Sequence, residues 1–359
     1  MLRFDANDTV LVSPLGWGLG HASRLIPVIN ALLDKGCTVV IGADPHTIEL
    51  LQPRFPNVEC FVFKSVNVKF SKGKHQLFSL IRIAIKLLLL AKREQRELKR
   101  IIDTKSITAI ISDNRYGLHA KGVKSVLVTH QLSPIFPKPF GWLQPLGKRY
   151  IKRQAQQFTE CWIPDSENGF RLSGNLSDGE VATPNARFVG LMSRFSLLEP
   201  QKLQKGFDLV GVVSGPPPHR QAFEQELINI GQRLNLRTLI VQGLPQGKNA
   251  ARTKGKVTLV PHLPDIQFAK ELISAKYVIC RSGYSTIMDL IALQCSAIIV
   301  PTPGQTEQEY LANRIEGEKL FGYCHQDGLR DLTIDMLEGS ALRINTRPGF
   351  QYFDLSVIQ

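Results

Sequence analysis

Short runs of β-branched and other apolar residues alternate with longer helical patterns along the whole 359-residue chain. Such alternation is typical of βαβ units, which build parallel sheets with helices on their faces. The pattern therefore predicts an α/β fold rich in parallel strands. Ten segments have the character of strands: residues 10–13, 38–41, 58–63, 107–112, 125–129, 208–214, 237–242, 257–260, 277–280 and 297–300.

These segments form two sets of five, and a chain of this length exceeds the usual size of one compact core. A polar stretch with Pro200 and Gly206 separates the sets. We therefore expect an N-terminal domain over residues 1–190, a linker over 191–205, a C-terminal domain over 206–340 and a tail over 341–359. Each domain is predicted to be Rossmann-like and doubly wound, with ligands bound beyond the carboxyl ends of its strands, in a cleft that the two domains face.

The composition is that of a globular protein, with 43% hydrophobic and 21% charged residues and a net charge of +13. Residues 1–190 hold 26 Lys and Arg against 15 Asp and Glu, whereas residues 191–359 hold 18 against 16. The excess in the first half favours an anionic partner, such as a phosphate-bearing acceptor, an acidic lipid or a nucleic acid. The alternative is a solvated basic face without a partner.

Six cysteines have neither CxxC pairing nor the spacing of a metal site, and no segment near residue 1 has the pattern of a secretory signal. These features together indicate a cytoplasmic setting. No cluster of acidic residues resembles a metal-binding motif, so we expect no obligatory metal.

A glycine-rich turn follows the first predicted strand and includes Gly18, Gly20 and His21. Glycines permit positive φ and close approach of a ligand, and the start of the next helix offers N–H groups to an anion. A histidine at a helix start is disfavoured in its protonated form, so His21 is predicted to accept a proton as a catalytic base. The alternatives are tight strand–helix packing for the glycines and a capping role for the histidine.

Polar segments also follow two strands of the second half. Arg281, Ser282, Gly283, Thr286 and Asp289 come directly after one strand, and a Ser-Gly turn at a helix start suits a diphosphate. Asp289 is predicted to accept hydrogen bonds from ribose hydroxyls. As the alternative, Thr286 and Asp289 form a capping box that is purely structural.

The next strand is followed by Gln305, Gln308 and Glu309, whose amide and carboxylate groups suit sugar hydroxyls. Here too a capping box, from Thr306 to Glu309, is the alternative. In the first half, Asp113 and His130 end two strands and are candidates for positioning or polarising an acceptor. A turn-forming Asp-Asn pair is the alternative for Asp113.

Residues 281–289 resemble the RSGxxTxxE segment of glycosyltransferase family 28, with aspartate at the last position. The turn at residues 16–21 is similar to the family's GGTGGH-type loop. Gln308 and Glu309 take the place of its Gln-Gln pair, with a departure at the second position, and His130 corresponds loosely to its HEQN segment. The resemblance spans most of the chain and is specific between about residues 275 and 315.

This resemblance implies a GT-B architecture and transfer of a hexose or N-acetylhexosamine from a UDP-sugar to a hydroxyl, for which a lipid-linked or envelope glycan is one candidate. The C-terminal domain is expected to hold the donor, with Ser214, Gly215 and Arg220 near its phosphates and Arg281 against the leaving diphosphate. In relatives the last segment returns to the first domain. No cofactor besides the donor substrate is implied.

Two other functions remain open. The turn from Gly18 to Arg24 also resembles the UDP-sugar hydrolase of pseudaminic-acid synthesis, in which water takes the place of the acceptor. A non-enzymatic, basic nucleotide-binding protein is the second alternative. Nucleic acid is not an expected partner, because the chain has no RNA-binding signature or helix-turn-helix pattern.

Residues 77–91 form a densely apolar helical pattern interrupted by Arg82 and Lys86. The stretch is too short and too charged for a membrane span. It is predicted either to pack on its own sheet or to dock on an anionic membrane, as the basic first half favours. The second alternative corresponds to a peripheral location at the inner face of the membrane.

Overall fold

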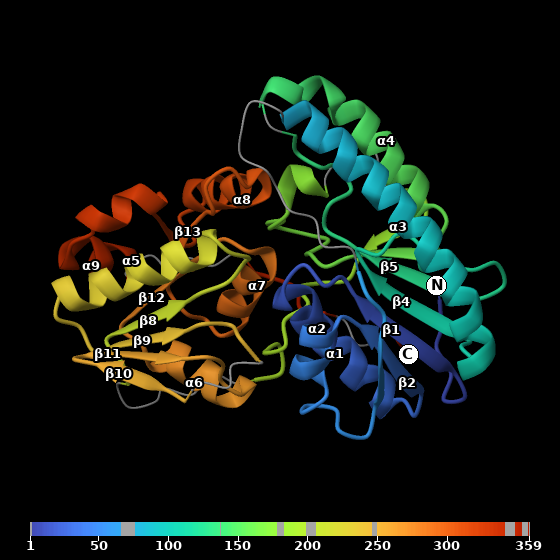
Figure 1. Cartoon of the computed structure of the whole chain (residues 1–359), viewed down its shortest axis with the longest axis horizontal. Helices are drawn as coiled ribbons and strands as arrows, with labels where there is room; N and C mark the ends of the chain where they lie inside the picture. The colour runs from blue at the N-terminus through green and yellow to red at the C-terminus, as the bar shows by residue number, and fades with distance from the viewer. Residues whose placement is uncertain are drawn as a thin grey trace. The chain divides into compact units, whose positions relative to one another are not determined.

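The computed structural model describes residues 2–65, 76–136, 138–177, 183–198, 206–245, 250–341, 349–353 and 358; for residues 76–88, 138–139 and 341 it describes the backbone alone. The chain divides into two compact units, each with its own sheet (Figure 1). Unit 1 comprises Met1–Met192 and Gln351–Gln359, and unit 2 comprises Ser193–Phe350.

Unit 1 contains a parallel seven-stranded sheet in the order β3-β2-β1-β4-β5-β6-β7. Its strands are β1 (Thr9–Pro14), β2 (Thr38–Ala43), β3 (Glu59–Val62), β4 (Ala109–Asp113), β5 (Lys124–Val128), β6 (Glu160–Ile163) and β7 (Ala186–Phe188). Its helices are α1 (Leu19–Asp34), α2 (Pro45–Leu51), α3 (Gln76–Lys105), η1 (Lys138–Leu143), α4 (Gln144–Ala155) and η2 (Gly174–Leu176).

Both faces of this sheet are covered, because side chains alternate along each strand. Val10 and Val12 of β1 join a core cluster with Leu25 and Ile29 of α1. Leu11, which lies between them, belongs to a second cluster that includes Leu98 and Ile101 of α3. Helices α1 and α3 therefore cover opposite faces, as Figure 1 shows.

Unit 2 contains a sheet in the order β10-β11-β9-β8-β12-β13-β14, in which the β10–β11 pair is antiparallel and the other pairs are parallel. Its strands are β8 (Leu209–Val212), β9 (Thr238–Val241), β10 (Arg252–Lys254), β11 (Val257–Val260), β12 (Tyr277–Arg281), β13 (Ile298–Val300) and β14 (Gly322–Tyr323). Its helices are α5 (His219–Arg233), α6 (Asp265–Ser274), α7 (Tyr284–Ala292), α8 (Thr306–Gly317), η3 (Gln326–Asp331) and α9 (Ile334–Ala341).

Helices α5 and α9 share one face of the second sheet, because Phe223, Leu227 and Leu337 join a cluster with strand residues such as Ile279. Helix α6 lies on the other face (Figure 1). The predicted α/β fold with two doubly wound sheets is thus confirmed.

Each of the ten predicted strand segments overlaps an observed strand, whereas β6, β7, β10 and β14 were not predicted. Three of the missed strands have only two or three residues, and β10 is exposed along its whole length. Segments this short show no alternation long enough to be recognised. They lie at or next to the sheet edges, where pairing with a neighbouring strand, rather than a pattern of their own, fixes their extended conformation.

The end of the chain packs on unit 1. Tyr352 forms a parallel bridge with Leu191, and the Phe353 ring lies 6.1 Å from the Trp162 ring, centroid to centroid. Met192 is buried in unit 1, and the next residue, Ser193, is buried in unit 2. The first residues of the predicted linker therefore belong to the two cores, and residues 199–205 lie outside the described ranges.

The apolar stretch at residues 77–91 lies in the first half of α3. Its side chains up to residue 88 are outside the described residues, so neither prediction for this stretch is tested. Within the ranges that the structure describes, no helix combines the length and the apolar character that a membrane span requires.

Candidate functional site

The first candidate site lies where the sheet of unit 1 changes its direction of winding. The chain runs from β1 to β2 and β3 on one side, then returns to β4 beside β1 and continues on the other side. Ligands of open α/β sheets bind beyond the carboxyl ends of strands at this kind of switch point. The last residues of the two strands, Pro14 and Asp113, are paired there.

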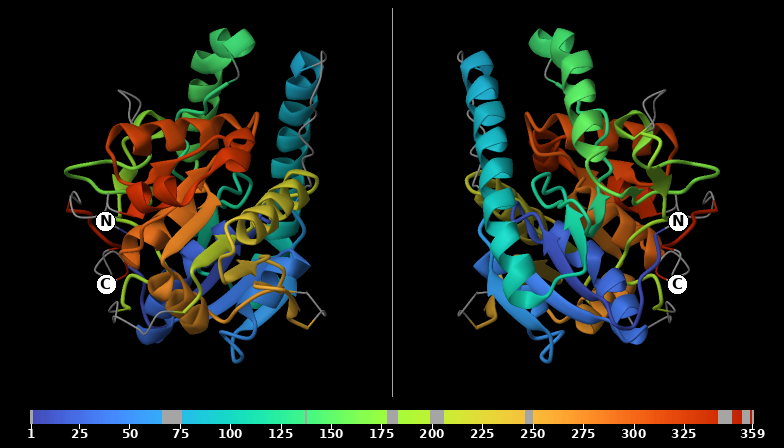
Figure 2. Two further views of the ribbon diagram at one scale, coloured as in Figure 1. Left: turned by 90° about the vertical axis from the view of Figure 1, so that its left-hand side faces the viewer. Right: turned by 90° about the vertical axis from the view of Figure 1, so that its right-hand side faces the viewer.

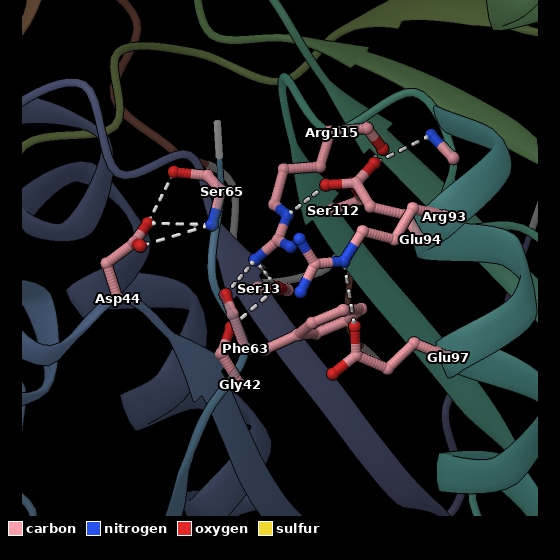
Figure 3. Close-up of polar contacts among 11 residues, drawn as sticks. Ser13, Gly42, Asp44, Phe63, Ser65, Arg93, Glu94, Glu97, Ser112 and Arg115 are labelled. Atoms are coloured by element: carbon pink, nitrogen blue, oxygen red, sulfur yellow. Dashed lines mark hydrogen bonds and ion pairs between the residues drawn. The ribbon is translucent and has the colours of Figure 1, made fainter. Parts of the chain in front are cut away.

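The turn from β1 to α1 is packed too closely for side chains at its first glycine. A Cβ atom on Gly16 would lie 1.8 Å from Asp44 Oδ2, and Asp44 in turn accepts hydrogen bonds from Ser65 (Figure 3). Gly18 has φ of +150° and precedes α1, whose first turn contains Gly20 and His21. The turn therefore requires glycine at two positions. At Gly16 a Cβ atom would overlap Asp44, and at Gly18 the backbone has a positive φ.

His21 and Asp113, both predicted as site residues, are in direct contact. His21 Nδ1 lies 2.8 Å from Asp113 Oδ1, and the His21 side chain is 20% exposed while Asp113 is fully buried. A carboxylate can only accept, so Nδ1 carries the proton of this hydrogen bond. The Nε2 atom of a neutral His21 is then the one with a free lone pair, which suits a general base.

Arg24 holds the other side of the same carboxylate. Its Nε lies 2.5 Å from Asp113 Oδ2 and its Nη2 lies 2.5 Å from Oδ1. Burial of Asp113 raises the pKa of its carboxyl group, but Arg24 and His21 outweigh this effect and lower that pKa to about 2. Asp113 is therefore ionised at neutral pH and cannot itself touch an acceptor from its buried position.

His130 lies behind Arg24 rather than at the surface. It is 3% exposed, and its Nδ1 atom lies 3.0 Å from Arg24 Nη1. The prediction that His130 polarises an acceptor directly does not fit this position. Unlike Asp113, which contacts His21 directly, His130 is connected to the site by its contact with Arg24.

Three buried residues near this site, Arg24, Arg115 and Glu94, have no role predicted from the sequence. Arg24 follows His21 by three residues, a spacing that places both on one face of a helix and is the signal that could have linked them. Arg115 and Glu94 form a second buried pair, with Nε 2.7 Å from Oε1, that connects α3 to the segment after β4 (Figure 3). Their separation of 21 residues along the chain carries no comparable signal.

The second candidate site lies at the corresponding switch point of unit 2, between β8 and β12. Helices α5, α7 and α8 begin just after β8, β12 and β13, at the carboxyl edge of the sheet. The first turns of α5 and α7 contain no acidic residue, whereas that of α8 contains Glu307 and Glu309. The positive ends of α5 and α7 therefore suit an anion, and α8 does not.

Arg281 has a structural place in this edge. It is 1% exposed, stacks 4.0 Å from the centroid of the Phe223 ring and donates to the carbonyl oxygens of Pro301 and His219. Burial lowers the pKa of Arg281 to about 10. Arg281 therefore donates its hydrogen bonds to protein carbonyl oxygens, and the predicted contact with a leaving diphosphate does not fit this position. Its role is to connect the start of α5 with the loop that precedes α8.

The Ser-Gly turn after β12 is hydrogen-bonded to α8. Ser282 Oγ donates to the carbonyl oxygen of Gln308 at 2.9 Å, and Gly283 is the N-cap of α7 with a negative φ. Thr286 is thus the third residue of the helix, and the capping box from Thr286 to Asp289 is wrong. The turn leaves the Gly283 backbone, rather than the Ser282 side chain, to meet a ligand.

The environment of Asp289 differs from the one predicted for a ribose-binding residue. Its Oδ1 accepts from Ser193 Oγ at 2.7 Å and its Oδ2 from Arg194 Nε at 3.1 Å, and the residue is 6% exposed. Burial raises the pKa of the Asp289 carboxyl, which the charge of Arg194 opposes. Both oxygens are engaged within unit 2, so the structure revises the predicted ribose contact. Aspartate stands here where the family has glutamate, and its shorter side chain keeps the carboxylate close to the backbone of α7.

Two of the three residues expected to bind a sugar, Gln308 and Glu309, hold the loop before α8 in place. Gln308 Oε1 accepts from the Thr302 N–H at 2.9 Å, and Glu309 Oε1 accepts from the Gly304 N–H at 2.8 Å. Gln305 is the N-cap of α8, so the capping box from Thr306 to Glu309 is also wrong. Each side chain uses one oxygen to shape the loop and keeps a second polar atom for other contacts.

The loop between β8 and α5 brings the remaining predicted donor residues to the same edge. Gly215 is exposed, with φ of +90° and open space where a Cβ would stand, and Ser214 before it is half-buried. Arg220 Nε donates to the Gln242 carbonyl oxygen at 3.2 Å. In the described ranges, no three His, Cys, Asp or Glu side chains are grouped to hold a metal ion.

Residues 211–348, all in unit 2, match the glycosyltransferase family 28 C-terminal domain. The UDP-N-acetylglucosamine–N-acetylmuramyl-(pentapeptide) pyrophosphoryl-undecaprenol N-acetylglucosamine transferase of Pasteurella multocida is 22% identical over 196 residues, 54% of this chain. The match spans about half, 50%, of that relative's length.

Solved structures resemble the chain over nearly its whole length. MurG of Acinetobacter baumannii has a TM-score of 0.53 at 13% identity, with 94% of each chain covered. The spinosyn rhamnosyltransferase SpnG complexed with thymidine diphosphate has a TM-score of 0.60 at 13% identity, with 94% of this chain and 95% of that one covered. Such likeness shows the fold. The chain therefore has the fold of GT-B glycosyltransferases, and residues 211–348 of unit 2 match the glycosyltransferase family 28 C-terminal domain.

Proposed function

We propose that the protein is a glycosyltransferase that moves a hexose or N-acetylhexosamine from a UDP-sugar to a hydroxyl acceptor. The observation that carries this proposal is the pairing of partly exposed His21 with buried, ionised Asp113 at the switch point of unit 1. The match of unit 2 to the family 28 C-terminal domain supports it.

In the proposed reaction His21 is the general base. Its Nε2 atom takes the proton of the acceptor hydroxyl as the acceptor oxygen bonds to the anomeric carbon. The bond from that carbon to the diphosphate breaks, and UDP leaves with the electron pair. Asp113 stabilises the imidazolium that forms, because its carboxylate lies 2.8 Å from Nδ1.

Unit 2 is proposed to bind the donor. The diphosphate would lie between the starts of α5 and α7, where no acidic side chain opposes it and the backbone of Gly215 and Gly283 permits close approach. The sugar hydroxyls would meet Gln305, Gln308 and Glu309 at the start of α8. A nucleoside diphosphate is supported by the name of the Pasteurella relative and by the thymidine diphosphate in the spinosyn enzyme.

Screening by thermal shift against a panel of nucleotide sugars tests the donor, because a bound ligand raises apparent stability. The preferred donor is then assayed for UDP release with and without monosaccharides, glycolipids and phenols. A transferase releases UDP rapidly only when an acceptor is present, and this release should persist in EDTA if no metal is obligatory. Rapid release with water alone would instead identify a hydrolase, and the absence of a shift with every nucleotide sugar would contradict both enzymes.

We further propose that unit 1 docks on an anionic membrane through the segment from Lys138 to Ala155. Trp142 and Leu146 are 67% and 62% exposed there, and the segment contains five Lys and Arg but no Asp or Glu. Figure 2 shows α3 (cyan) and α4 (green) extending from the sheet of unit 1 in the same direction.

Sedimentation with vesicles tests this docking surface. Binding to anionic vesicles should weaken with salt and with Trp142→Ala, and neutral vesicles should bind little. Leu197→Ala is the matched control, because Leu197 is 76% exposed but belongs to unit 2. Equal sedimentation of both variants with wild type would exclude the segment, as would the absence of binding to either vesicle.

A further inference from the structure

Arg24 connects two parts of the site that the sequence leaves far apart. From α1 its guanidinium reaches both carboxylate oxygens of Asp113, at the end of β4, and Nδ1 of His130, which follows β5. The side chain is 1% exposed. One residue therefore fixes the positions of an acid and a second histidine around His21.

The chemistry of guanidinium determines the proton positions in this cluster. Arginine has donors but no acceptor, so His130 Nδ1 must accept the hydrogen bond from Nη1 and cannot itself carry a proton. A His130 with an unprotonated Nδ1 is neutral and carries its proton on Nε2.

The same reasoning applies to His21. Asp113 Oδ1 accepts from Arg24 Nη2 at 2.5 Å and from His21 Nδ1 at 2.8 Å. Arg24 Nη2 also lies 3.2 Å from His21 Nδ1, but that nitrogen already donates its proton to the carboxylate. The cluster is consistent only if the two histidines have opposite tautomers, with the proton on Nδ1 of His21 and on Nε2 of His130.

We propose that Arg24 is the positioning residue of the site, and that it leaves Nε2 of His21 as the proton acceptor by holding Asp113 and His130. This inference rests on the proposed function in one respect, the role of His21 as the base. Lysine could not substitute, because a single ammonium cannot form two parallel bonds to a carboxylate and a third to an imidazole in one plane.

Unit 1 contains a matched control for this role. Arg115 also forms a buried pair with a carboxylate, that of Glu94, and stacks 4.2 Å from the centroid of the Phe63 ring (Figure 3). Its side chain donates to Glu94, Ser13 and the Phe63 carbonyl oxygen, and not to His21 or Asp113. Arg115→Lys therefore measures the structural cost of replacing a buried arginine near β4.

Nitrogen-15 NMR of histidine-labelled protein tests the tautomers without any enzymatic assay. The eight histidines can be assigned with His21→Gln and His130→Gln variants. We expect a protonated Nδ1 on His21 and an unprotonated Nδ1 on His130 in wild type, and loss of this pattern in folded Arg24→Lys but not in Arg115→Lys. A wild-type His21 protonated only on Nε2 would overturn the proposal, as would an unchanged pattern in Arg24→Lys.

Turnover gives the second test. Arg24→Lys should lower kcat about 10²-fold with the donor KM little changed, since misplacement of about 1 Å has that effect. Added to Asp113→Asn, it should cost no more than about threefold, because the two act through one contact. Full additivity of the two changes would contradict the positioning role. Absence of transfer in wild type with every donor would defeat the proposed function alone, while the NMR result would still decide the tautomers.

Discussion

Two aspartates of this chain have similar settings in the sequence and different environments in the structure. Asp113 and Asp289 each lie in or after a strand–turn segment predicted to bind a substrate. Asp113 lies against His21 and Arg24 at a switch point, whereas Asp289 is bound to Ser193 and Arg194. His21 and Asp113 could be predicted because each follows a predicted strand of the same sheet, whereas Ser193 and Arg194, the partners of Asp289, lie in the predicted linker, where no pattern indicates their position.

Asp113 should stabilise the fold in a pH-dependent way. Its pKa is lowered from 3.8 to about 2, so the stabilisation is fully present above pH 3.8 and is lost as the pH falls through 2. The shift corresponds to about 2 kcal/mol. Urea unfolding should show Asp113→Asn to be less stable than wild type by about this amount at pH 7, with a smaller difference at pH 3. A difference that grows towards pH 3 would contradict this assignment.

Asp289→Asn should affect stability rather than donor affinity. Replacing a buried, hydrogen-bonded carboxylate by an amide beside Arg194 should cost about 1–3 kcal/mol of unfolding free energy. Calorimetric titration with UDP should give nearly the wild-type affinity for the folded variant. Asp327→Asn, at an exposed position, is the control for loss of one charge. Substantially weaker UDP binding by folded Asp289→Asn would contradict this view and support the original prediction that Asp289 contacts the ribose.

At the scale of elements, both candidate sites lie at the starts of helices. The sequence predicted two polar helix starts after consecutive strands, and α7 and α8 begin there, after β12 and β13. The alternative of a capping box at each start is wrong, because Thr286 and Thr306 each lie inside their helix. The capping-box pattern is local, whereas the actual helix start depends on where the preceding strand ends in the sheet.

Gly16→Ala should damage the turn before α1. The new Cβ would overlap the Asp44 carboxylate, so that the Asp44–Ser65 contact or the turn must move. We expect a loss of about 1–3 kcal/mol in unfolding free energy and reduced turnover. Gly339→Ala, in α9 with open space around it, should be neutral or stabilising. Equal stability of the two variants would show that the turn tolerates a side chain.

At the scale of the whole molecule, alternating strand and helix patterns were sufficient to predict two doubly wound sheets. The sheet orders place β1 beside β4 and β8 beside β12, and those two positions hold the residues proposed for catalysis and donor binding. The return of the last segment to unit 1 was expected from the family resemblance and is observed. Its particular contacts, the bridge from Tyr352 to Leu191 and the packing of Phe353 on Trp162, have no local pattern in the sequence.

Deletion of residues 351–359 should therefore destabilise unit 1 more than unit 2. Phe353 is 7% exposed, and its removal exposes the cluster around Trp162. Hydrogen exchange should increase in β6 and β7, while α5 and α7 keep wild-type protection and UDP affinity is retained. Equal loss of protection in both units would mean that the segment stabilises the molecule as a whole.

The central claim, that base catalysis resides in unit 1 and donor binding in unit 2, is tested most directly by His21→Ala. Turnover is followed as acceptor-dependent UDP release, and UDP affinity is measured by calorimetry on the same folded preparation. The account predicts a fall in kcat of about 10²–10⁴-fold, typical of a lost general base, with a nearly unchanged dissociation constant for UDP. Full turnover in this variant, or loss of UDP binding without loss of kcat, would contradict it.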